Sequence, residues 1–340
     1  MLSQGSGSAS LRLDNRDGQL DPLNGSSPYN LVPMRHARIK ATTGEAVFQG
    51  YVDRWPPVWR FNDAVIDVEL VDCRVWLALQ DLDVDLPGQQ THERIGSLLA
   101  DAGWPAGLRD IGEGVVWIDP FVQSGANLLR VIEDTADAED GFLHVSPDGK
   151  LTFRSRHHTL NSTSQLSVGG ENVRVGQARA AFDGATLINV GRVELGSGVV
   201  YEARDTGSVA AYGPRVFPVR DLPVPAAEAV GLAQWVVYRF ASPNLSLPQV
   251  SLKVVENVEL ATVLALRVGD LVTFGHTPPS GAIEVDGVVE SLGHRVSDGV
   301  WRTDLSLAPY FGAGGWMTWN DDLGSQGGPG WDDEGAQWAP

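Results

Sequence analysis

The stretch Ala64-Val65-Ile66-Asp67-Val68-Glu69-Leu70-Val71 decides the fold class of the first part of this sequence. Its even-numbered positions are all apolar, whereas its odd-numbered positions include the acidic residues Asp67 and Glu69. Successive side chains of a β-strand point to opposite faces, so a period of two indicates one buried face and one wetter face. The stretch therefore predicts a half-buried β-strand.

Short strands and turns precede this stretch at close intervals. Strands are expected at residues 11–13, 38–41 and 47–52, and turn signals lie at residues 14–18, 21–22 and 24–25. Closely spaced short strands with turns between them are typical of a barrel or a sandwich. We therefore predict that residues 1–86 form a first β-barrel-like domain.

Residues 87–158 have the pattern of a small α+β domain. Apolar residues at helical spacing predict two amphipathic helices, formed by Ile95, Leu98, Leu99 and Ala102 and by Leu128, Val131, Ile132 and Thr135. Thr91 and Ser124 are expected to cap these helices, because a hydroxyl oxygen can accept a hydrogen bond from a first-turn N–H.

A β-hairpin is expected to complete this α+β domain. The sequence Pro147-Asp148-Gly149 supplies a tight turn with a residue that tolerates positive φ. The flanking strands are then expected to pair, with Leu143 and Val145 opposite Leu151 and Phe153.

A second β-rich region is predicted over residues 159–312. Its strands are expected at residues 188–190, 193–195, 199–201, 250–255, 271–274, 285–292 and 300–307. Pro223 and Pro225 are expected to open a helix over residues 225–240, and Ser242-Pro243 ends it. The predicted fold class is therefore mainly β with α+β insertions, comprising two barrel-like domains and small α/β domains.

The charge balance excludes some classes of function. The chain has 340 residues, with 25 Lys and Arg against 43 Asp and Glu, which gives a formal net charge of −18. Such a chain repels phosphates and anionic lipid, so a general nucleic-acid binder or a basic membrane-surface protein is disfavoured. Apolar runs are too short to span a membrane and the first residues do not resemble a signal peptide, so we expect synthesis in the cytoplasm and no membrane insertion.

Candidate metal sites are incomplete. Cys73 is the single cysteine, so an intrachain disulfide and a cysteine-cluster metal site are both excluded, and we expect it to be buried. His92-Glu93-Arg94-Ile95 begins like a zinc-protease helix, but Gly96 stands where the second histidine is required. Asp81, Asp83 and Asp85 are better explained as a solvated strand end than as a calcium loop. His157-His158 is better explained as a pair of surface histidines. We therefore expect no metal and no cofactor.

Candidate catalytic groups are also weak. Asp119, Glu133, Asp137 and Glu139 lie close together in the sequence and could include an acid/base pair. Their positions on and beside the polar face of a helix favour simple solvation, and we expect no catalytic residue among them. Neither a phosphate-binding loop nor a nucleophile elbow is present.

The eleven tryptophans fall into different settings. Trp76, Trp235 and Trp301 occur in apolar-patterned elements and are expected in cores. Four others occur in the Gly/Trp/Asp-rich tail of residues 313–340: Trp316, Trp319, Trp331 and Trp338. This tail cannot bury a core of its own, so we predict that these four residues dock a partner.

Several segments, taken in order, resemble the tail-hub (minor tail) proteins of long-tailed bacteriophages, especially phages that infect actinobacteria. The N-terminal segments are residues 11–24, 27–29, 33–35, 48–55 and 71–74. The later segments are residues 125–129, 139–141, 148–156, 188–190, 212–215, 268–272 and 301–305. The resemblance covers most of residues 11–309. Family members usually carry at least one further strand before the first segment, so either the start lies upstream or the first barrel lacks a strand.

The resemblance implies a structural role in the virion. Such proteins form a trimeric ring at the distal end of the tail tube, and each chain supplies two β-barrel domains to match the hexameric tube. The implied partners are two further copies, the distal tail protein, other tail-tip proteins and the tape measure protein. Genomic DNA would only pass through the lumen during ejection, and the protein would lie at the virion tail tip after assembly in the host cytoplasm.

Two alternative functions stay open at the level of sequence. One is a tail-associated hydrolase, and the other is a carbohydrate-binding tail module that uses exposed tryptophans. The hydrolase is disfavoured because the residues after 312 are too few for a catalytic domain.

Overall fold

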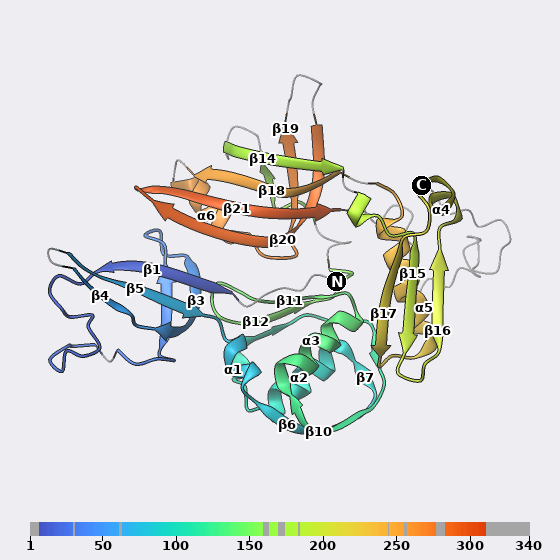
Figure 1. Cartoon of the computed structure of the whole chain (residues 1–340), viewed down its shortest axis with the longest axis horizontal. Helices are drawn as coiled ribbons and strands as arrows, with labels where there is room; N and C mark the ends of the chain where they lie inside the picture. The colour runs from blue at the N-terminus through green and yellow to red at the C-terminus, as the bar shows by residue number, and fades with distance from the viewer. Residues whose placement is uncertain are drawn as a thin grey trace.

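The computed structural model describes residues 7–29, 31–60, 63–158, 163–168, 174–182, 184–243, 245–254, 257–276 and 283–310. The protein is mainly β, as predicted, with helices confined to two of its four lobes apart from one helix beside the second sheet. Figure 1 shows the first sheet at the left, the α+β lobe below, a small α/β lobe at the right and the second sheet above.

The first lobe is an antiparallel sheet with the strand order β1-β5-β3-β2. Its strands are β1 (Ser8–Asp14), β2 (His36–Lys40), β3 (Ala46–Arg54), β4 (Pro57–Arg60), which pairs with β5, and β5 (Asp63–Val71). The alternation that predicted β5 is confirmed, because Ile66, Val68 and Leu70 are at most 3% exposed and form the core with Val52.

The α+β lobe packs three helices against short strands. Its helices are α1 (Arg74–Ala78), α2 (Thr91–Asp101) and α3 (Leu128–Ala138), with a 3-10 turn at Ala106–Leu108. Its strands are β6 (Asp81–Leu86), β7 (Gln89–Gln90), β8 (Arg109–Ile111), β9 (Trp117–Ile118), β10 (Phe121–Asn127), β11 (Phe142–Val145) and β12 (Leu151–Arg154). Strand β6 pairs with β10 and its Val84 and Leu86 join this core, so the lobe also uses residues N-terminal to position 87.

The expected hairpin is confirmed in its register. Strands β11 and β12 are antiparallel, with Leu143 opposite Phe153 and Val145 opposite Leu151. Gly149 has a φ of 81°, a left-handed conformation that glycine adopts without the steric cost of a side chain.

Both predicted helix caps were wrong, although both helices are present. The residue before α2 is Gln90, whose backbone N–H donates to the Glu93 carboxylate at 3.0 Å, while Thr91 is already helical. Asn127 caps α3 by accepting from the Arg130 N–H, whereas the Ser124 hydroxyl donates to Asp83 at 2.6 Å. The cap of α2 is thus one residue before the predicted one, and the cap of α3 is three residues after it.

The α/β lobe is a three-stranded sheet covered by one long helix. It contains β15 (Val190–Leu195), β16 (Val200–Arg204), α4 (Thr206–Tyr212), β17 (Val216–Leu222) and α5 (Ala226–Phe240). A Cβ at Gly191 would lie 2.4 Å from the Ala233 carbonyl oxygen, so glycine is what lets β15 approach the α5 backbone. The expected helix over 225–240 is confirmed as α5.

The second sheet has six strands in the order β13-β19-β20-β21-β18-β14. These are β13 (Leu166–Val168), β14 (Arg174–Phe182), β18 (Leu245–Val254), β19 (Leu271–His276), β20 (Ile283–Ser297) and β21 (Val300–Pro309). Helix α6 (Asn257–Ala265) supplies Leu260, Val263 and Leu264 to its core. A 3-10 turn at Gly184–Thr186 follows β14.

Of the three tryptophans expected in cores, Trp76 was wrongly assigned. Trp235 is 4% exposed, and Trp301 is partly buried against the second core. Trp76 is 36% exposed, because the short helix α1 turns Leu77 inward and leaves Trp76 at the surface, edge-on to Tyr51. Helices α1, α4 and α6 were not predicted, since five to nine residues are too few to show a clear helical period.

Candidate functional site: open sheet edges and an interdomain cleft

Strand β14 is a long open edge of the second sheet. Among the described residues it pairs only with β18, so its other side presents backbone N–H and C=O groups that no described strand satisfies. Its residues 176–180 are all exposed. A long edge of this kind is a template for pairing with another chain.

Ala178 marks where the core of this sheet is left uncovered. It is in register with Val250, whose side chain is fully buried in the second core, so both residues belong to the core face of the sheet. Ala178 itself is exposed. Within the described part of the chain, the core face is therefore not closed at this edge.

The first sheet also has open edges. Within the described ranges, β1 and β2 each pair with one neighbour only. Their outward side chains are polar: Arg12 pairs with Asp67 at 2.7 Å, and Arg38 donates to the Gln49 side chain at 2.6 Å. Charged side chains on an edge strand disfavour indiscriminate pairing while leaving a specific partner possible.

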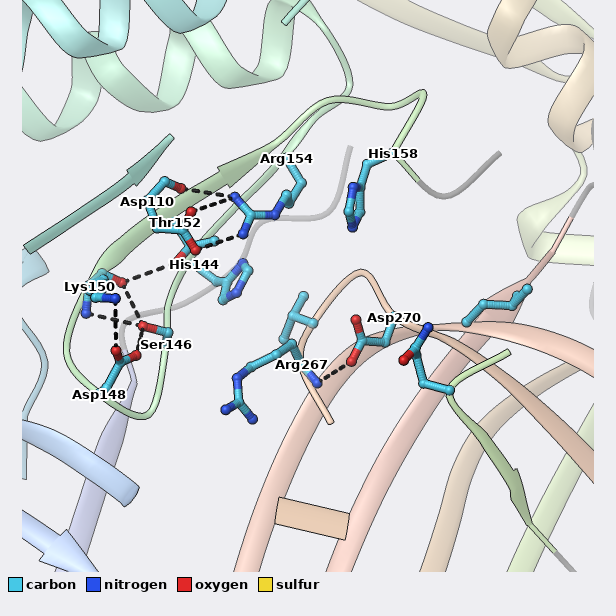
Figure 2. Close-up of a pocket in the computed structure, with 13 residues that line it drawn as sticks. Asp110, His144, Ser146, Asp148, Lys150, Thr152, Arg154, His158, Arg267 and Asp270 are labelled. Atoms are coloured by element: carbon cyan, nitrogen blue, oxygen red, sulfur yellow. Dashed lines mark hydrogen bonds and ion pairs between the residues drawn. The ribbon is translucent and has the colours of Figure 1, made fainter. Parts of the chain in front are cut away.

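A polar cleft of about 410 Å³ separates the hairpin β11–β12 from the second sheet. Figure 2 shows side chains from the hairpin on one side and Arg267 and Asp270 on the other. An apolar contact joins the same two lobes, formed by Phe142, Val268, Leu271, Val288 and Tyr310. The two lobes thus meet through an apolar contact with a wet, polar cleft beside it.

Charges in the cleft are mostly paired with one another. Arg154 binds Asp110 at 2.7 Å, and Lys150 binds Asp148 at 3.2 Å. The Arg267 guanidinium donates to the carbonyl oxygens of Leu264 and Leu266. Paired charges of this kind suit a contact between lobes better than a catalytic site, which requires a group held ready to react.

His144 is the most buried titratable group in the cleft. It is 8% exposed, and its Nδ1 has no hydrogen-bond partner among the described residues. Burial, together with the nearby Arg154 and Arg267, lowers the pKa of His144 from 6.5 to about 4. His144 is therefore a neutral side chain at physiological pH, and its protonation requires a charge to enter the protein interior.

We expect acid to destabilise the protein through His144. Its folded pKa lies below its unfolded pKa, so stability is complete above about pH 6.5 and is lost as the pH falls toward 4. A shift from 6.5 to about 4 corresponds to about 3 kcal/mol for this one group at roughly 1.4 kcal/mol per unit. Urea unfolding at pH 7 and pH 4.5 measures this loss.

The control for the pH prediction is His144→Asn, which keeps a polar side chain but cannot titrate. The variant is expected to lose less stability between these pH values than the parent. His157 and His294, whose pKa values burial also lowers to about 4, account for part of the remaining slope. An identical slope in parent and variant would contradict the assignment to His144.

Glu139, at the end of α3, connects α2 to the segment that precedes β9 through buried hydrogen bonds. We call this contact the junction. It is 0% exposed, accepts a hydrogen bond from the Thr91 hydroxyl, and accepts another from the Val115 N–H at 3.1 Å. A Cβ at Gly114 would lie 2.0 Å from the Thr91 hydroxyl oxygen, so only glycine fits there. Burial raises the pKa of Glu139.

The same junction reaches the α/β lobe. Trp235 of α5 donates its indole N–H to Asp140 at 2.8 Å, and Arg239 lies 3.4 Å from the same carboxylate. Arg156 is 7% exposed and lies over the Trp235 ring. The core is also shared, because Val116, Ile118 and Ala138 pack among residues of α5 and β17. These contacts join the α+β and α/β lobes into a single packed unit.

The carboxylates considered for catalysis have different interactions in the structure. Glu133 forms an ion pair with Arg74, and the pKa of Asp137 rises to about 6 through burial and neighbouring acids. The expectation that Glu139 is solvated was wrong: it lies at the end of α3, where the chain turns inward, and it satisfies buried donors. Its interior position follows from the packing of segment 114–116, which no local pattern reveals.

The metal candidates have other roles in the structure. Asp81, Asp83 and Asp85 are on the exposed face of β6, as expected, and Asp83 accepts from the Gly125 N–H at a bulge in β10. His92 contacts the Gly114 carbonyl through Nδ1. Cys73 is 3% exposed as expected, and burial raises its pKa to about 12. Within the described ranges, no three His, Cys, Asp or Glu residues gather as metal ligands.

The four tail tryptophans lie outside the described residues: Trp316, Trp319, Trp331 and Trp338. In the part of the chain that the structure describes, no helix is long and apolar enough to cross a membrane.

Comparison with known proteins identifies relatives by structure only. No protein-family model matches the chain, and no curated protein matches it. A tail protein from prophage MuSo2 of Shewanella oneidensis matches with a TM-score of 0.60 at 17% identity, over 91% of this chain and 90% of that one. A tail protein from Neisseria meningitidis matches with a TM-score of 0.65 at 10% identity, over 90% and 89% of the two chains.

A third match extends the fold beyond phages. The E. coli c3393 protein, a type VI secretion system component with structural similarity to T4 bacteriophage tail proteins gp27 and gp5, matches with a TM-score of 0.52 at 11% identity. The match covers 83% of this chain and 65% of that one. At these identities the comparison establishes the fold, and the fold of this chain is that of phage tail proteins.

Proposed function

We propose that this chain is a structural protein of a phage tail, which forms a homotrimeric hub at the distal end of the tail tube. The observation that carries the proposal is the pair of open-edged sheets in a fold shared with tail proteins over nine tenths of the chain. The earlier resemblance of residues 11–309 to tail-hub proteins of actinobacterial phages supports the hub role and the host.

The open edges support assembly by contact between chains. A trimer would supply six such sheets, and each β14 edge would gain a neighbour for its backbone groups and for the uncovered core face at Ala178. The other proposed partners are the distal tail protein, further tail-tip proteins and the tape measure protein. DNA would contact the ring only in transit, and the protein would act without catalysis, metal or cofactor.

The proposal is tested by mass and by position. Light scattering of the full chain should give three times the 36.5 kDa chain mass, and a virion reconstruction should place three copies at the tail tip. A monomer at high concentration, together with one or six copies in the virion map, would refute the hub. Cleavage of peptidoglycan by the purified chain, lost in Glu133→Gln, would refute the non-catalytic role.

A further inference from the structure

Strand pairing in the second sheet aligns four basic residues in one row. Arg174 of β14 is in register with Lys253 of β18, Lys253 with Arg302 of β21, and Arg302 with Arg295 of β20. The four strands are consecutive neighbours in the sheet (Figure 1). We call these four positions the basic row.

Three of the four positions in the basic row face solvent. Lys253, Arg295 and Arg302 are exposed, whereas the residues beside them along β18 and β21, such as Leu252 and Thr303, are buried. Registered residues on neighbouring strands share a face at about 5 Å spacing. The row therefore presents closely spaced positive charge on the outer face of the sheet.

The described residues provide no ion pair for these charges. None of Lys253, Arg295 and Arg302 has a carboxylate within 4 Å among them. The acid that follows on the same face is Asp304, which lies in the adjacent row, between Ser251 and Gly293. Like charges directly opposite one another destabilise a sheet, so the row costs stability unless an anion covers it.

The chain itself carries a matching anion. Residues 313–340 contain five acidic residues and no basic residue: Asp321, Asp322, Asp332, Asp333 and Glu334. Each of these acidic residues lies within three residues of a tryptophan. The tail and this face are therefore complementary in charge.

The tail is long enough to reach the row within one chain. Arg302 is eight residues before Tyr310, a separation of about 26 Å along β21 at roughly 3.3 Å per residue. Asp321 follows Tyr310 by eleven residues, which can extend over about 36 Å. Residues 311–320 can thus turn back along the sheet and place the acidic groups on the row.

We propose that the basic row is the docking site of the acidic, tryptophan-rich segment 313–340 of the same chain. Docking reduces the repulsion between the aligned positive charges of the sheet. It also removes apolar surface of the tail tryptophans from water. If the chain forms the proposed hub, the docked tail would also shield these positive charges from the phosphates of passing DNA.

The test is photo-cross-linking in the full-length protein, with benzoylphenylalanine in place of Trp331. We expect cross-linked peptides from β18, β20 or β21 around the basic row, in a product with the mass of one chain. Lys253→Glu combined with Arg302→Glu should reduce the yield at least fivefold. Arg220→Glu is the matched control, because Arg220 is exposed on β17 and has no ion pair among the described residues, and it should leave the yield unchanged.

A charge swap separates electrostatic docking from misfolding. Adding Asp332→Lys and Asp333→Lys to the Lys253→Glu, Arg302→Glu chain should restore the cross-link, since opposite charges again face each other. Three outcomes overturn the proposal: cross-links that avoid the basic row, an equal loss with Arg220→Glu, or a covalent dimer, which would place the tail on a neighbouring copy. Duplex DNA binding that depends on Lys253 and Arg302, with tail cross-linking unaffected by their reversal, would assign the row to nucleic acid and also overturn it.

Discussion

Replacing Glu139 with leucine is expected to lower the free energy of unfolding by about 3–5 kcal/mol, the range for removing one partner from a buried charged network. Glu139 is fully buried and accepts from the Thr91 hydroxyl and the Val115 N–H. Burial of Arg156 lowers the pKa of its guanidinium, and the nearby charge of Glu139 opposes this by raising that pKa. Leucine would leave the Thr91 hydroxyl and the Val115 N–H without this acceptor in a fully buried site.

Urea unfolding at pH 7 measures the Glu139 effect, and two variants calibrate it. Glu139→Gln keeps a hydrogen-bond acceptor and is expected to cost about 1–2 kcal/mol, within the range for a perturbed buried hydrogen bond. Glu113→Leu removes an exposed carboxylate from the neighbouring loop and should change stability by less than about 0.5 kcal/mol. A Glu139→Leu chain as stable as the parent would show that the junction does not depend on this carboxylate.

The substitution Ala178→Glu is expected to convert the proposed trimer into monomers. Ala178 is exposed on the core face of β14, so a longer charged side chain should be tolerated in the single chain. In the trimer that we propose, a neighbouring chain covers this position, and burial of an unpaired carboxylate would cost several kcal/mol.

Light scattering and circular dichroism together check the assembly prediction. The Ala178→Glu chain should have one third of the parent mass, with β-rich circular dichroism retained. Ser197→Glu is the control, because Ser197 is exposed in the turn between β15 and β16, away from both open sheets. A trimer that persists in Ala178→Glu would exclude this edge from the interface.

Local patterns were sufficient where a single segment decides its own structure. The alternation over 64–71 predicted β5, because the burial of one face requires a period of two. Pro147-Asp148-Gly149 predicted the register of β11 and β12, since a short turn fixes which residues lie opposite. The proline-opened helix α5 was predicted for the same kind of reason.

Predictions from local sequence failed where distant segments decide the environment. Glu139 resembles its solvated neighbours in sequence, but segment 114–116 folds over it and supplies its donors. Trp76 is apolar in an apolar stretch, but the turn of α1 exposes it. The cap of each helix depended on which residue the preceding strand delivered to the first turn.

The sequence alone determined the mainly β class, the strands with clear alternation, the hairpin and the long helix, because each depends on contacts between residues close in the chain. The tertiary structure alone decided which strands are neighbours. Arg174, Lys253, Arg295 and Arg302 are spread over more than a hundred residues, and only the order β14-β18-β21-β20 brings them into one row. Pairing between distant strands depends on the free energy of the whole core, which no single segment contains.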